Sequence, residues 1–121
     1  MSQTTPIYLD CGDLETFDGT VVDAAGAPVD IQSARIEFGV KKLEQDSAFV
    51  IFRTSDPGDG ITILDDGTSP NRGKYRVSML PSQTQVEPGY YVYAVRVIYG
   101  PNDEHTVVRG TALFSGNAVP S

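Results

Sequence analysis

Four aspartates in two neighbouring loops are the residues whose type and spacing come nearest to those of a functional site. Asp56 and Asp59 precede the short segment 61–64, and Asp65 and Asp66 follow it. Calcium takes carboxylate oxygens from loops, so calcium at these four residues is one alternative. Their spacing differs from the twelve-residue EF-hand loop, and turns themselves favour Asp beside Gly. We therefore expect turn residues and no metal site, with calcium left open as the alternative.

Nucleophilic and acid–base candidates are few. His105 is the single histidine, which excludes any site that needs two imidazoles, and we expect it to be solvated beside a turn. The chain has no Gly-x-Ser-x-Gly motif of the kind that exposes a catalytic serine. The lone Cys11 cannot form an intrachain disulfide and is expected to act as a small, partly buried apolar residue. We predict no catalytic residue, no cofactor and no enzymatic activity.

Charge and hydropathy exclude several classes of partner. The 121 residues carry 16 acidic and 9 basic side chains, a formal net charge of −7. Nucleic acids and anionic membranes are bound mainly through Lys and Arg, so we predict neither partner. Residues 1–9 lack the basic and apolar regions of a signal peptide, and no apolar run approaches the ~20 residues of a membrane-spanning helix. We expect synthesis in the cytoplasm.

The strongest local structural pattern is a β-hairpin over residues 85–114. Tyr90–Tyr99 is rich in β-branched and aromatic residues, Gly100–Asp103 consists of turn formers, and Thr106–Phe114 returns to strand formers. Strand formers bounded by turn formers in this way are typical of a hairpin. These two strands are expected to organise the rest of the chain.

Alternating polarity along the sequence predicts further strands. Ala34–Val40 and Lys74–Leu80 alternate apolar and polar residues, as half-buried strands do. Shorter strand-like segments lie at 7–11, 48–54 and 61–63. Short strands at intervals of about 8–12 residues are typical of an all-β sandwich. We predict one domain over residues 1–121, an immunoglobulin-like antiparallel β-sandwich of about 7–9 strands, with a flexible arm at 1–6 and a polar tail at 116–121.

A corner motif precedes the hairpin. The segment Glu87–Tyr93 is similar to the corner of immunoglobulin-like domains, in which a tyrosine hydroxyl bonds back to the preceding loop. This similarity makes Gly89 and Tyr91 the predicted structural corner. Tyr93 occupies the position of the usual cysteine, and the chain has no Trp, so the antibody-type disulfide and core tryptophan are both missing.

The long strand after this corner has two apolar faces. Four alternate residues are predicted to face the core, namely Tyr91, Tyr93, Val95 and Val97. The opposite positions are also apolar, and exposed apolar faces mark interaction sites. The predicted interface consists of these outward positions and the start of the first strand: Tyr90, Val92, Ile98, Ile7 and Tyr8. The alternative is that loops or the tail cover this face.

Two stretches carry a resemblance to a known family. Gly12–Val40 has a turn at Gly26–Asp30 followed by the strand pattern Ala34–Phe38, and Glu87–Phe114 contains the alternating run Gly89–Val97. In this order they resemble the immunoglobulin-like domain at the N-terminus of phage baseplate upper proteins, and related small proteins of tailed-phage virions.

The resemblance implies a structural role in a bacteriophage virion. The expected function is multi-copy assembly on the tail, baseplate or neck through contacts with other virion proteins, as a homo-oligomer or symmetric array. Capsid decoration is the alternative position, and a carbohydrate or cell-surface binding module is the alternative of another class. The expected location is the virion.

Overall fold

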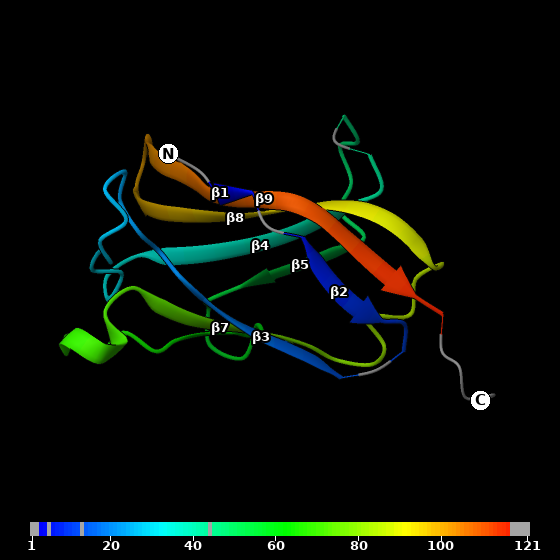
Figure 1. Cartoon of the computed structure of the whole chain (residues 1–121), viewed down its shortest axis with the longest axis horizontal. Coiled ribbons are helices and arrows are strands. Elements are labelled where there is room, and N and C mark those ends of the chain that lie inside the picture. Colours follow the sequence, from blue (N-terminus) through cyan, green and yellow to red (C-terminus); the bar gives the residue numbers. More distant parts are fainter. Residues whose placement is uncertain (1–2, 5, 13, 44, 117–121) are drawn as a thin grey trace.

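The structure is a computed structural model that describes residues 3–4, 6–12, 14–43 and 45–116. Nine strands and one 3-10 turn are present in these ranges (Figure 1). In chain order they are β1 (Gln3–Thr4), β2 (Ile7–Asp10), β3 (Glu15–Thr20), β4 (Arg35–Lys41), β5 (Ile51–Thr54), β6 (Ile61–Ile63), η1 (Ser69–Asn71), β7 (Lys74–Met79), β8 (Gly89–Gly100) and β9 (Asp103–Ser115). Within the described ranges there is no helix of the length and hydropathy that crossing a bilayer requires.

The strands form two sheets. The larger sheet has the order β1-β9-β8-β4-β5, with β2 also paired to β9, and the smaller has the order β3-β7-β6. This division, with the strands of the long hairpin in one sheet and β3, β6 and β7 in the other, is that of an immunoglobulin-like sandwich. The predicted fold class is therefore confirmed. Figure 1 shows the β8–β9 hairpin running the length of the larger sheet.

The N-terminal strands depart from the predicted antiparallel arrangement and from the predicted loose arm. Both β1 and β2 pair with β9 in parallel, whereas the other strand pairs are antiparallel. After β2 the chain leaves this sheet at Gly12, whose φ of +79° suits glycine, and enters the other sheet at β3. Because β2 is not joined to β9 by a hairpin, nothing requires the two strands to run in opposite directions. Gln3 and Thr4, within the expected arm, form β1, while residues 1, 2 and 5 and tail residues 117–121 lie outside the described residues.

The core lies between the two sheets. Phe38 of β4, Val77 of β7 and Val95 of β8 are all 0% exposed. The ring of Phe38 contacts Phe17 of β3 edge-on, with ring centroids 5.3 Å apart. These contacts join the sheets through the strands whose alternating pattern predicted one buried face.

One position in the smaller sheet has no room for a side chain. Gly19 of β3 is paired with Tyr75 of β7, and a Cβ at residue 19 would collide with the Tyr75 hydroxyl. Tyr75 is 2% exposed, and burial raises the pKa of its phenol to about 12. Gly19 therefore provides the space in which this buried ring lies.

Candidate functional site

The outer face of the larger sheet, which points away from the core, carries a row of large apolar side chains at one end. Leu113 of β9 lies between Tyr8 of β2 and Tyr90 of β8, paired with both. Tyr8 is 71% exposed and Tyr90 is 69% exposed. We call Tyr8, Leu113 and Tyr90 the aromatic row. It joins residues from the two ends of the chain into one exposed patch.

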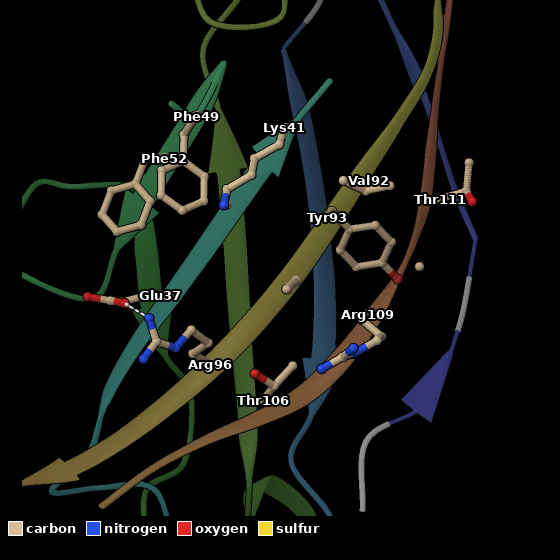
Figure 2. Close-up of a pocket in the computed structure, with 13 residues that line it drawn as sticks. Glu37, Lys41, Phe49, Phe52, Val92, Tyr93, Arg96, Thr106, Arg109 and Thr111 are labelled. Carbon is tan, nitrogen blue, oxygen red and sulfur yellow. Dashed lines mark ion pairs between the residues drawn. The ribbon is translucent and has the colours of Figure 1, made fainter. Parts of the chain in front are cut away.

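A hollow of about 440 Å³ lies on the same face, and Figure 2 shows residues that line it. Its lining includes Val92 and Thr111, a pair two positions along β8 and β9 from the pair Tyr90 and Leu113 of the aromatic row. Its floor includes Gly39 of β4 and Ala94 of β8, which are paired neighbours. On one side stand the rings of Phe49 and Phe52, with centroids 4.9 Å apart. A Cβ at Gly39 would collide with the Phe49 ring, so this glycine allows the ring to lie against the sheet. Small residues in the floor and bulky rings beside it create the depth.

Basic side chains surround the hollow. Lys41 lies with its Nζ 4.8 Å from the centre of the Phe49 ring, which places a cation on an aromatic face. Arg96 and Arg109 line the opposite side, from β8 and β9 (Figure 2). Glu37 is the acidic residue in the lining.

Charged pairs cover the far end of the outer face. Nη2 of Arg96 lies 2.7 Å from a carboxylate oxygen of Glu104, and its Nη1 lies 3.8 Å from Glu37. Glu37 also pairs with Arg35 at 3.0 Å, and Arg35 contacts Asp56 at 3.3 Å. The outer face thus runs from the aromatic row, through the hollow, to a charged network.

The predicted interface residues fall into two groups. Tyr8, Tyr90, Val92 and Ile98 belong to the outer face, and Val92 lines the hollow. Ile7 points the other way and packs, half-buried, against the core. In strand β2 adjacent residues face opposite sides, so Ile7 and Tyr8 cannot share one surface.

Phe49 and Phe52 were not among the predicted interface residues. The run of apolar residues at 49–52 is consistent with either a central strand or an interface strand. The structure places β5 at the edge of the larger sheet, so the central position is wrong. Ile51 of this run is buried, whereas Phe52 is 41% and Phe49 47% exposed. All four residues of the run 49–52 are apolar, whereas one buried face of a strand takes only alternate residues. This excess was the signal in the sequence for two outward rings.

The corner before β8 shows the contact that its motif predicts. The Tyr91 hydroxyl donates a hydrogen bond of 2.7 Å to the backbone carbonyl of Glu87. Gly89 has a φ of +145°, a conformation that other residues rarely adopt. The bond holds the loop against the start of β8, and so fixes the direction in which Tyr90 points outward.

Replacing Tyr91 with Phe should destabilise the fold by about 0.5–1.5 kcal/mol, because the Glu87 carbonyl loses its partner. Urea unfolding of the whole chain measures this difference. The matched control is Tyr90→Phe, which removes a hydroxyl from an exposed ring and should change stability by less than about 0.5 kcal/mol. Equal effects of the two substitutions would argue against a structural corner.

The four loop aspartates each have local partners. Asp65 is buried and accepts backbone N–H bonds from Ile31, Gly67 and Gly73 at 3.0, 2.9 and 2.9 Å. These bonds, led by that from Gly73, lower the pKa of Asp65. The other three are satisfied separately: Asp66 by Thr68 and Asn71, Asp59 by Thr54, and Asp56 by Arg35. Among the described residues, no group of three or more His, Cys, Asp or Glu side chains is placed to hold a metal.

The remaining chemical candidates lie apart from the outer-face hollow. His105 is exposed and its Nε2 lies 2.8 Å from a carboxylate oxygen of Asp103, the first residue of β9. Cys11 is half-buried beside the core, and burial raises the pKa of its thiol above the ordinary value. A raised pKa keeps a thiol protonated and poorly nucleophilic at neutral pH.

Comparison with known proteins gives likenesses among solved structures but no family. No protein-family model matches the chain, and no curated protein is similar to it. Among solved structures, AggA, the major subunit of aggregative adherence fimbriae type I from Escherichia coli, is similar over 94% of this chain and 91% of its own. The two are 15% identical, with a TM-score of 0.40. The assignment of this chain to the immunoglobulin-like sandwiches rests on its own strand order and corner.

Proposed function

We propose that this protein is a structural component that assembles through the outer face of its larger sheet. The observation that carries the proposal is the aromatic row: two tyrosines about 70% exposed flank Leu113 on three paired strands. Exposed tyrosines on rigid elements are favoured anchors of protein interfaces, because little conformational entropy is lost when they are covered. The hollow next to the row extends the same surface.

The proposed setting is the virion of a tailed bacteriophage. The support is the resemblance of Gly12–Val40 and Glu87–Phe114 to domains of such virions. The protein would be present in several copies on the tail, baseplate or neck, bound to other virion proteins, with capsid decoration as the alternative position. It would act by binding and positioning its neighbours, without catalysis or cofactor.

Replacing Tyr90 with Ser should reduce incorporation into particles at least about tenfold, because truncating an interface anchor commonly costs that much affinity or more. Particles from host cells that make the variant as their sole copy of this protein are purified by sedimentation, and their protein content is measured.

The control substitution is Leu14→Ser, which truncates another exposed apolar residue, 62% exposed and outside the larger sheet. It should leave incorporation unchanged. Normal incorporation of the Tyr90→Ser protein, or an equal loss with Leu14→Ser, would contradict the assignment of the outer face.

A further inference from the structure

We propose that the hollow on the outer face binds an acidic segment of a partner protein, one that inserts an apolar side chain between flanking carboxylates. The inference rests on the proposed docking role of this face, and names the chemistry of the partner at that site.

Charge is distributed unequally between the hollow and the rest of the chain. The hollow is lined by three of the chain's 9 basic side chains, Lys41, Arg96 and Arg109, but by one of its 16 acidic ones, Glu37. If Glu104 is added, because it pairs with Arg96, the basic side chains still outnumber the acidic ones. A positive site on a chain of net charge −7 favours an anionic partner and disfavours a cationic one.

The shape of the hollow indicates what else the partner must present. Ala94 presents only a methyl group to the floor, and the Phe49 ring lies over Gly39. The rings of Phe49 and Phe52 together form an apolar side. A volume of about 440 Å³ accommodates a large side chain together with the backbone beside it. An aromatic or aliphatic side chain would cover the rings and the floor. Carboxylates on either side of it would then reach the basic residues at the rim.

A second copy of the chain docking face to face fits less well. A two-fold axis through the hollow would place the hollow of one copy against the hollow of the other, so that the basic residues of the two copies would face each other. Like charges brought together at an interface disfavour that pairing. The charge of the hollow therefore points to an acidic segment from a different surface.

A peptide titration of the full chain tests the proposal. The probe is an acetylated and amidated pentapeptide, Asp-Glu-Phe-Glu-Asp, added to the isotopically labelled protein and followed by NMR. Two matched peptides replace either the central Phe with Ala or the four acids with Lys. Binding of the first peptide should shift the amide signals of Gly39, Ala94 and Gly110, weaken with added salt, and exceed the binding of either matched peptide about tenfold.

Two charge reversals complete the test. Lys41→Glu changes the rim of the hollow and should weaken the peptide about tenfold, whereas Lys74→Glu makes the same change in the smaller sheet and should leave binding intact. Equal binding of all three peptides, or shifts away from the hollow, would overturn the inference. So would self-association of the chain that Lys41→Glu abolishes while no peptide binds, because a second copy would then be the occupant.

The same variants separate this inference from the proposed function. If particle incorporation depends on Tyr90 but is unaffected by Lys41→Glu, the outer face docks and the acidic partner is wrong. If neither Tyr90→Ser nor Lys41→Glu changes particle incorporation while the peptide binds in the hollow, the docking role in particles is wrong and the binding chemistry is right.

Discussion

Replacing Phe38 with Ala should lower the free energy of unfolding by about 3–5 kcal/mol, the largest loss expected from a single core truncation in this chain. Phe38 is 0% exposed and contacts rings from both sheets, with centroids 5.3 Å from Phe17 and 6.0 Å from Tyr93. Removing it leaves a cavity that neighbours on two rigid sheets cannot fill. Since small domains are stable by only about 5–15 kcal/mol, much of the total would be lost.

Urea unfolding followed by tyrosine fluorescence measures this loss. The matched control is Phe52→Ala, the same substitution on the next strand at a ring that is 41% exposed on the outer face. It should cost far less, because less apolar area returns to water and no enclosed cavity forms. Similar losses for the two variants would show that Phe52 is covered in solution, which would argue against an open outer face.

Replacing Asp65 with Asn should produce the largest pH-dependent loss of stability. Both oxygens of Asp65 accept backbone N–H groups, from Ile31 and Gly73 at one and Gly67 at the other. An Asn side chain presents an NH₂ group to one of these donors, whichever way it is turned. We expect the thermal midpoint at pH 7 to fall by at least about 5 °C.

The sign of the pH dependence follows from the lowered pKa of Asp65. A carboxylate stabilised in the folded state contributes stability above the unfolded pKa of about 3.9, and the contribution is lost as pH falls through the lower folded pKa. The difference between wild type and Asp65→Asn should therefore be largest at neutral pH and shrink below about pH 4. Asp10→Asn removes the same charge from an exposed residue and serves as the control. A constant difference across this range would be inconsistent with the ionised form as the hydrogen-bond acceptor.

Local patterns were sufficient to predict most of the sandwich. Alternation identified the buried faces of β4 and β7, and the strand formers around Gly100–Asp103 identified the hairpin. The parallel pairing of β1 and β2 with β9 was not predicted, because it depends on contacts between opposite ends of the chain. Residues 3–4 and 7–10 carry no local signal for the direction of a partner strand about a hundred positions away.

The outer face was predictable in part. Alternation along β8 identified Tyr90 and Val92 as outward, since one strand fixes the relation between its own residues. The hollow was not predictable, because its floor and sides come from β4, β5, β8 and β9 and from Phe49 just before β5. Its depth depends on Gly39 and Ala94 being neighbours, a matter of register that neither strand reveals alone.

The parallel pairing of β2 with β9 has a mechanical consequence. Ile7 pairs with Ala112 and Asp10 with Ser115, so the chain enters this pair at one end and leaves it at the other. A pulling force applied between positions before Ile7 and after Ser115 would slide the strands along each other. Such shear loads the hydrogen bonds of the pair together, whereas a hairpin pulled at its open end breaks them one after another. We therefore expect the β2–β9 pair to resist tension applied between these two positions.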